Sequence, residues 1–296
     1  MTTFRIFAAA LTGAALAIAT TPASAAQCNH KGGFPAFLTD IKKDAAKNGI
    51  SQRGLGTLDG LTVDDKVLAA DRRQHVFKQS FEEFSGRMIS KDRLVKGQRL
   101  MKEYGGQIRK IEQTYGVPGG VIVAIWGLET DYGVNQGKMS VVRSVATLAY
   151  DCRRTDKFQA ELMDAMRIVD RGDMASADMK GDWAGEIGQT QFLPSSYVKY
   201  AVSFSGRGKP DLINNKSDVL ASTANYLAQK GWRRGQGWGP GEPNFDVIKE
   251  WNKAEVYAKT IALFGQKLQG QSSQAAEEPA PAKKGMPSIK GKRASR

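Results

Sequence analysis

The stretch VPGGVIVAIWGLETDYG, residues 117–133, decides how the sequence is interpreted. Pro118 suits the first turn of a helix, and the apolar run that follows ends at one acid, Glu129. Trp126 and Ile125 stand three and four positions before Glu129, so this acid shares the helix face that packs into the protein. Burial disfavours the charged form of a carboxyl and raises its pKa, which suits a general acid. A core glutamate held by arginine or backbone donors is an equal alternative at this point.

Composition excludes several classes of protein. The chain has 296 residues, 41% hydrophobic and 25% charged, which excludes a disordered, collagen-like or multi-span membrane protein. Two histidines, His30 and His75, and two cysteines, Cys28 and Cys152, are too few and too far apart for a zinc ribbon or a two-histidine metalloprotease helix. We predict no bound metal and no cofactor. The formal net charge of +13 indicates a polyanionic partner, either nucleic acid or a cell wall.

The N-terminal segment is typical of a secretory signal peptide. Residues 1–25 contain one arginine, an apolar run at 6–19 and the small residues Ala-Ser-Ala at 23–25 before a cleavage site. The apolar run is shorter than the roughly 20 residues that span a bilayer, so a membrane anchor is disfavoured. Gln27 stands where a lipoprotein motif needs a small residue before its cysteine. We expect a soluble exported protein without lipidation and without a membrane span after processing.

Export changes what the two cysteines are expected to do. In an oxidising compartment Cys28 and Cys152 can pair, which ties the start of the mature chain to its middle. We predict this disulfide, and two buried free thiols are the alternative.

Helical periodicity of apolar residues runs through most of the chain. Four segments show it, with Gly105-Gly106 a bend or break inside the second: 34–49, 90–116, 158–172 and 217–231. No sustained alternation of period two appears, so any sheet must be small. After about residue 265 the sequence is rich in Gln, Ser, Ala, Pro and Lys, which predicts a disordered basic tail at 266–296.

A loop rich in glycine and amides follows further along the chain. It reads GDWAGEIGQTQFLPSSY, residues 181–197. Gln189 and Gln191 offer amide groups, and Trp183 and Tyr197 offer flat apolar surfaces. Such groups hold a sugar through hydrogen bonds to its hydroxyls and through ring stacking.

Together these segments resemble the lytic murein transglycosylase B family. The motifs that carry the resemblance are, in order, IWGLETDYG, GEIGQTQFLPSSY, DVLASTANYLAQKGW and WNKAEVY, and the resemblance covers most of residues 34–265. It implies an enzyme of the periplasm that acts on peptidoglycan glycan strands. It also implies a mainly α fold, with an α+β lysozyme-like core that holds a small sheet at most, plus an additional helical domain.

The resemblance, together with the signal peptide and the tail indicated by composition, suggests a division of the chain into four parts. We expect a signal peptide at 1–25, an N-terminal helical region at 26–110, a lysozyme-like catalytic domain at 111–265 and the disordered basic tail at 266–296.

The resemblance also implies roles for individual residues. Glu129 matches the sole catalytic acid and base of the family, and Gln191 matches a sugar-binding amide. Further residues of the substrate cleft are matched by Tyr226, Asn252 and Tyr257, and we predict that Asp182 also belongs to the substrate-binding residues. One position departs from the family pattern, because Asp182 stands where many relatives have serine. Its carboxylate could raise the pKa of Glu129 by like charge or could be displaced outward, and both outcomes stay open.

The reaction that the family implies is cleavage of the β-1,4 bond between N-acetylmuramic acid and N-acetylglucosamine without water. Ordinary glycosidases need two carboxylates. One suffices when the N-acetyl group of the sugar stabilises the cation and its C6 hydroxyl attacks, because Glu129 then donates and regains one proton. The product carries a 1,6-anhydro ring. Asp131 points to another side of the helix, whereas Asp182 and Glu186 remain candidates for a second carboxylate.

Two other functions stay open. A lysozyme-type hydrolase would use a second carboxylate. A noncatalytic peptidoglycan-binding scaffold is suggested by the basic tail, which could recruit cell-wall proteins, and by the departure at Asp182. An exported chain without an interleaved basic and aromatic motif gives no basis for nucleic-acid binding.

Residues 203–218, SFSGRGKPDLINNKSD, resemble the calcium loop of some relatives. Ser203 and Arg207 stand where carboxylates normally bind the ion, and Arg207 adds a positive charge. We predict a loop without metal. A weak site built on Asp211 and Asp218 is the alternative.

Overall fold

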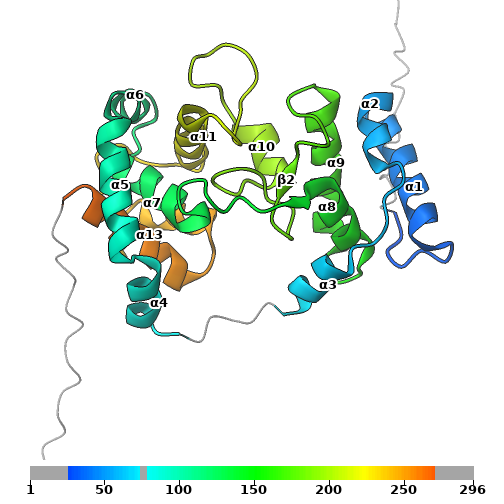
Figure 1. Ribbon diagram of the computed structural model, residues 1–296, viewed down its shortest axis with the longest axis horizontal. Coiled ribbons are helices and arrows are strands. Elements are labelled where there is room, and N and C mark those ends of the chain that lie inside the picture. Colours follow the sequence, from blue (N-terminus) through cyan, green and yellow to red (C-terminus); the bar gives the residue numbers. More distant parts are fainter. Residues whose placement is uncertain (1–25, 74–78, 271–296) are drawn as a thin grey trace, which may run out of the picture.

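The structure of the chain is a computed structural model that describes residues 26–73 and 79–270. Helices dominate these ranges, as the sequence predicts (Figure 1). They are α1 (Gly33–Lys47), α2 (Gln52–Leu55), the 3-10 helix η1 (Gly56–Leu58), α3 (Asp65–Arg72), α4 (Phe81–Met88), α5 (Lys91–Glu103), α6 (Gly105–Tyr115), α7 (Gly119–Thr130), α8 (Val141–Tyr150), α9 (Thr155–Asp170), α10 (Pro194–Tyr200), α11 (Lys216–Gln229), α12 (Phe245–Trp251) and α13 (Glu255–Leu268). No helix within these ranges is long and apolar enough to cross a membrane. The predicted signal peptide and nearly all of the predicted tail lie outside the described residues.

One small sheet accompanies the helices of the described ranges. Its strands, β1 (Met139–Ser140) and β2 (Lys180–Gly181), are antiparallel. Isolated bridges then join Gly181 to Ile187 and Ile187 to Phe192. These pairings fold the segment between β2 and α10 back on itself. The predicted fold class, mainly α with a small sheet at most, is confirmed.

The central helix of the fold is α7. α5, α11 and α13 pack against it, and every residue of α7 except Glu129 is buried. Pro118 stands immediately before the helix, and Asp131 ends it with a left-handed backbone at φ 52°. The helix break predicted at Gly105-Gly106 is also present, because α5 ends at Glu103 and α6 begins at Gly105.

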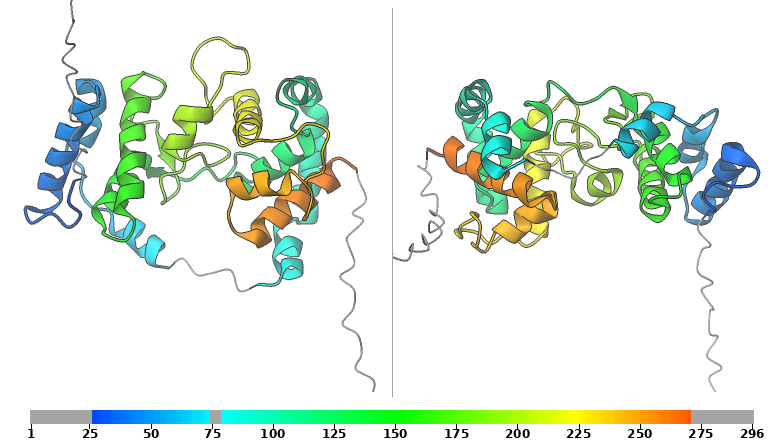
Figure 2. Two further views of the ribbon diagram at one scale, coloured as in Figure 1. Left: turned by 180° about the vertical axis from the view of Figure 1, so that it is seen from behind. Right: turned by 90° about the horizontal axis from the view of Figure 1, so that it is seen from below.

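The helices that precede α7 divide between the two ends of the molecule. α1, α2 and α3 pack against α8 and α9 at one end, whereas α4, α5 and α6 lie with α7, α11 and α13 at the other (Figure 1, Figure 2). The N-terminal region expected at 26–110 is therefore not one spatial unit. Its boundary with the region 111–265 falls inside α6, and the start of the tail expected at residue 266 falls inside α13.

A disulfide ties the first described residues to the middle of the chain. Cys28 and Cys152 are bonded, with their Cα atoms 5.2 Å apart and a sequence separation of 124. Nearby, the carboxylate of Asp71 in α3 is buried and pairs with Arg153 and Arg154. The connection between α8 and α9 thus anchors both the N-terminal residues and α3.

Close packing of α7 on α13 generates the first prediction. A Cβ added at Gly120 would lie 2.4 Å from the carbonyl oxygen of Gly265, a backbone atom that cannot rotate away. We expect Gly120→Ala to lower the free energy of unfolding by about 1–3 kcal/mol. Unfolding in denaturant measures this difference in the free energy of unfolding between the variant and the wild type.

Gly86→Ala is the matched control. Gly86 lies inside α4 with nothing within 4 Å of the added Cβ. Because alanine favours a helix more than glycine does, this variant should be about 0.5–1 kcal/mol more stable. Equal stability of the two variants would contradict the packing described.

Candidate active site

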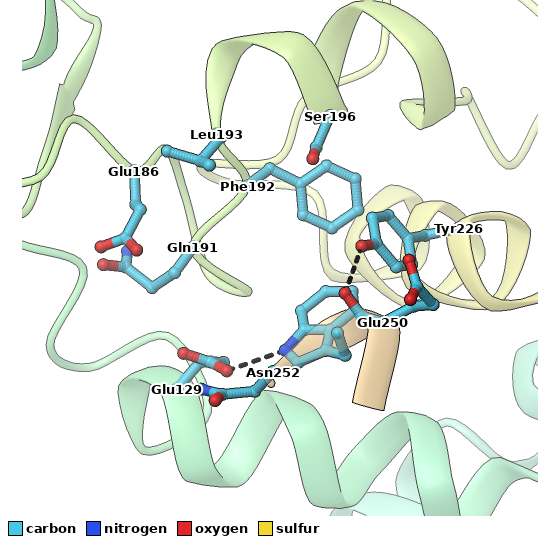
Figure 3. A pocket seen from close by; sticks show the side chains of 10 residues that line it. Glu129, Glu186, Gln191, Phe192, Leu193, Ser196, Tyr226, Glu250 and Asn252 are labelled. Carbon is cyan, nitrogen blue, oxygen red and sulfur yellow. Dashed lines mark hydrogen bonds between the residues drawn. The ribbon is translucent and has the colours of Figure 1, made fainter. Parts of the chain in front are cut away.

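Separate parts of the chain meet around a cavity of about 200 Å³ (Figure 3). They are the end of α7, the loop from β2 into α10, the helix α11 and the end of α12. The lining residues are Glu129, Glu186, Gln191, Phe192, Leu193, Ser196, Tyr226, Glu250, Trp251 and Asn252. Carboxyl groups, amides and aromatic rings share its walls, a combination that can bind a polar ligand with flat apolar faces.

Glu129 extends into this cavity from the last turn of α7. Its Oε1 atom accepts a hydrogen bond from Trp251 Nε1 at 2.8 Å and another from the Tyr257 hydroxyl at 3.0 Å. Loss of water around the carboxyl raises its pKa to about 6, and the two donors oppose that rise because they favour the carboxylate. Glu129 forms no ion pair within the described ranges, so it is not a core glutamate held by arginine.

The next acid along the chain is held away from the cavity. Asp131 pairs with Arg93 and Lys96 of α5 at 3.4 and 3.2 Å. Lys96 also donates to the backbone carbonyl of Asp131. These contacts fix the end of α7 and keep a second negative charge on its outer side, as the helical spacing predicts.

Gln191 lines the cavity in a constrained backbone conformation. It has a positive φ of 53°, which is rare for any residue other than glycine. Its Nε2 atom donates to the carbonyls of Gly188 and Gln136 at 2.8 and 3.3 Å. The side chain is therefore oriented before any ligand arrives, and its Oε1 atom accepts no hydrogen bond from the residues that the structure describes.

The sequence interpretation of Gln189 and Tyr197 as sugar-binding groups is wrong. Gln189 is buried, accepts from Trp126 Nε1 at 2.9 Å and donates to the carbonyl of Ile213 at 2.8 Å. Tyr197 is fully buried and donates to the carbonyl of Pro210. Both residues hold the loop onto the core.

Three other residues predicted for the cleft gather near Glu129. Tyr226 lines the cavity, and its hydroxyl donates to the carbonyl of Glu250 at 2.8 Å (Figure 3). Asn252 lines it as well, with Oδ1 accepting from the backbone of Ala254. Tyr257 reaches the same place from α13 through its hydrogen bond to Glu129.

The prediction of Asp182 as a substrate-binding residue is wrong for this cavity, because Asp182 does not line it. It is exposed, and its Oδ1 accepts from the N–H of Trp183 at 2.7 Å. Its charge contributes to raising the pKa of Glu186 rather than that of Glu129. Of the two outcomes left open by the sequence, the structure favours the outward one.

Sequence reasoning assigned no role to Trp251, although it begins the quoted motif WNKAEVY. It donates to Glu129 and packs edge-on against Tyr226 and Phe192, with ring centroids 4.9 and 5.5 Å apart. Glu186, named only as one candidate for a second carboxylate, shares the cavity with Glu129. The signal for Trp251 was its place beside Asn252 in one motif.

The carboxylates of the loop at 203–218 bind backbone groups. Asp218 accepts from the N–H groups of Phe204 and Asp211 at 2.8 and 3.0 Å. Asp211 accepts from those of Ile213 and Asn214. Within the described ranges no group of three or more His, Cys, Asp or Glu residues could hold a metal ion.

Comparison with known proteins identifies the family. Residues 33–241 match the Transglycosylase SLT domain, and the chain belongs to this family. It is 35% identical over 166 residues to the membrane-bound lytic murein transglycosylase B of Escherichia coli strain K12. That match covers 53% of this chain and 46% of the relative, so the chain spans about half the length of the curated relative it matches.

Solved structures share the fold. The SltB3 protein of Pseudomonas aeruginosa, solved in complex with NAG-anhNAM-pentapeptide, is 28% identical with a TM-score of 0.75, and 80% of each chain is covered. The Escherichia coli lytic transglycosylase SLT35, solved in complex with calcium, is 25% identical with a TM-score of 0.70. That match covers 82% of this chain and 96% of SLT35.

The raised pKa of Glu129 predicts a pH-dependent stability. The carboxyl titrates at about 6 when folded against an ordinary value of 4.5, so the folded protein holds this proton more tightly than the unfolded chain. Burial of the Glu129 carboxyl therefore lowers the free energy of unfolding above pH 6 and leaves it unchanged below pH 4. We expect the free energy of unfolding of Glu129→Gln to exceed that of the wild type by about 2 kcal/mol near pH 8. The two values should be equal near pH 4.

The control for this measurement is Glu255→Gln. Glu255 lies in α13, and its hydrogen bond from Lys259 lowers its pKa. That residue stabilises the folded protein at high pH, so its replacement should lower stability near pH 8. A Glu129→Gln variant that is no more stable than the wild type near pH 8 would contradict the assigned burial.

The loop at 203–218 generates a prediction for calcium. Because the Asp211 and Asp218 carboxylates already accept backbone hydrogen bonds, we expect no heat of binding when the protein is titrated with micromolar calcium. Isothermal titration calorimetry measures it, with magnesium as the parallel titrant. Micromolar affinity for calcium would show that the predicted loop without metal is wrong.

Proposed function

We propose that this protein is a lytic transglycosylase. It would cleave the β-1,4 bond between N-acetylmuramic acid and N-acetylglucosamine in peptidoglycan and leave 1,6-anhydro ends, with Glu129 as the single acid and base. The observation that carries the proposal is the environment of Glu129, a desolvated carboxyl with two hydrogen-bond donors at a cavity of sugar-binding character. Membership of the transglycosylase family and the NAG-anhNAM-pentapeptide bound by SltB3 support it.

The first chemical step is proton donation. With its pKa raised to about 6, Glu129 is protonated in part of the population near neutral pH. It gives that proton to the glycosidic oxygen as the bond from this oxygen to C1 breaks. The acetamido group of the muramic sugar stabilises the positive charge at C1, so no second protein carboxylate has to do so.

The second step closes the anhydro ring. The C6 hydroxyl oxygen of the same sugar bonds to C1, and its proton passes to the Glu129 carboxylate. Glu129 is restored and no water is consumed. Trp251 and Tyr257 donate to the carboxylate between the two steps, which stabilises the state in which the proton has left.

The cavity walls can position the sugar for these steps. Tyr226 and Trp251 form an aromatic surface, with ring centroids 4.9 Å apart. Gln191 offers a fixed carbonyl oxygen, and Asn252 offers an amide nitrogen with no partner in the described ranges. Holding the sugar so that O6 faces C1 is the main requirement of an intramolecular attack.

We also propose that the protein acts in the periplasm after removal of residues 1–25. Its substrate lies there, and the predicted signal peptide would direct it there. Peptidoglycan glycan strands are the proposed partner, and the basic residues after 266 would add attraction to that polyanion.

A hydrolase is the second candidate, because Glu186 places another carboxyl at the cavity. A second carboxylate is what activation of a water molecule requires. The two reactions differ in their products, since hydrolysis leaves reducing ends that are heavier by one water.

Digestion of purified murein by the wild-type protein tests the proposal. Mass spectrometry of the released muropeptides should find anhydro ends. Glu129→Gln should reduce release by about a hundredfold to ten-thousandfold because it removes the acid and base.

Glu255→Gln, a surface change in α13, is the control and should leave release unchanged. Products with reducing ends alone would assign a hydrolase. Full activity of Glu129→Gln would exclude Glu129 as the catalytic residue.

A further inference from the structure

A second carboxyl at the cavity, Glu186, has no use in the mechanism described above. It lies in the loop between β2 and α10, whereas Glu129 projects from α7 (Figure 3). The side chain of Glu186 is partly buried and forms no hydrogen bond or ion pair with any other residue of the described ranges. An unpartnered carboxyl in a partly closed cavity is costly to keep charged. A ligand that enters the cavity would supply the hydrogen-bond partner that the protein does not provide to Glu186.

The charged groups around Glu186 favour its neutral form. Burial raises its pKa to about 7, and the negative charges of Glu129 and Asp182 add to the rise. Lys157 and Arg154 of the α9 region lower it by less, and Arg154 is paired with Asp71. The remaining charge of the lining, Glu250, is paired with Lys230 and Lys253. Glu186 therefore carries its proton at mildly acidic pH.

Most hydrogen-bond donors around the cavity already donate to acceptors of the protein. Trp251 and Tyr257 donate to Glu129, and Tyr226 donates to a backbone carbonyl. Both hydrogens of the Gln191 amide point at backbone carbonyls. Among the described lining residues, the Asn252 amide nitrogen is a free donor on the side of α12, and on the side of the loop a protonated Glu186 is the donor left beside Ser196.

We infer that Glu186 contacts the substrate and, in its neutral form, donates a hydrogen bond to an oxygen of the bound sugar. This inference rests on the proposed function, because it assigns the ligand of the same cavity. It gives the site two carboxyls with separate tasks: Glu129 transfers the proton, and Glu186 holds the sugar while keeping its own proton. Both must then be protonated at the start of the reaction.

The pH dependence of kcat/KM tests this directly. If two protonated carboxyls are needed, log kcat/KM of the wild type should fall above pH 7 with a limiting slope of about −2. Glu186→Gln keeps the size of the side chain and a donor but cannot ionise, so its slope should be about −1. Glu186→Ala should lose about tenfold in kcat/KM near pH 6 through the missing hydrogen bond.

A binding measurement tests the role of Glu186 without relying on activity. It therefore remains informative if the wild type is inactive or if a variant folds differently. In the Glu129→Gln background, the affinity for a chitooligosaccharide of five N-acetylglucosamine units should weaken as pH rises through the pKa of Glu186. Replacing Glu186 by Gln in that background should remove this pH dependence. Thermal unfolding of each variant shows whether the fold is retained.

The outcomes separate the two proposals. An inactive wild type defeats the proposed function, whereas the binding measurement still decides the role of Glu186. Equal slopes for the wild type and Glu186→Gln, or pH-independent binding in both backgrounds, would overturn the inference. Loss of only the reducing-end products in Glu186→Gln would also overturn it, since Glu186 would then activate water.

Discussion

The whole site depends on desolvation of one carboxyl at the end of a buried helix. α7 is buried on every side, and Glu129 is its single partly exposed residue. Loss of water raises the pKa of Glu129, and the negative end of the helix dipole acts in the same direction. Trp251 and Tyr257 act in the opposite direction by donating to the carboxylate. The balance leaves a group that can give up a proton and take it back near neutral pH.

The rest of the fold supports this balance. Packing of α13 on α7 at Gly120 and Gly265 brings Tyr257 to Glu129, and α12 brings Trp251 there. The segment after β2 is folded back by its bridges, so that Gln191 and Glu186 reach the cavity. At the far end, the disulfide and the pairs of Asp71 hold the N-terminal helices onto α8 and α9. The carboxyl thus sits where several elements far apart in sequence converge.

Local patterns in the sequence predicted the features that depend on neighbours along the chain. The helix at α7, the break at Gly105 and the inward side of Glu129 all follow from spacing of a few residues. Gln189 was misjudged because it was assigned by its residue type and by its place in the same loop as Gln191. The left-handed backbone at Gln191 and the bridge from Ile187 to Phe192 give the two amides different surroundings, and Gln191 lines the cavity whereas Gln189 does not. Trp251 meets Glu129 across 122 residues of sequence, a contact that no local pattern encodes.

The most direct test of this account is the titration of Glu129 itself. Carbon-13 NMR of protein labelled at the glutamate side-chain carboxyl carbons follows each group with pH, and the Glu129→Gln variant assigns the resonance by its absence. The account predicts that the missing resonance titrates near pH 6, above the ordinary value of 4.5. A Glu129 resonance that titrates at or below 4.5 would contradict it, because the carboxyl would then hold no proton to donate near neutral pH.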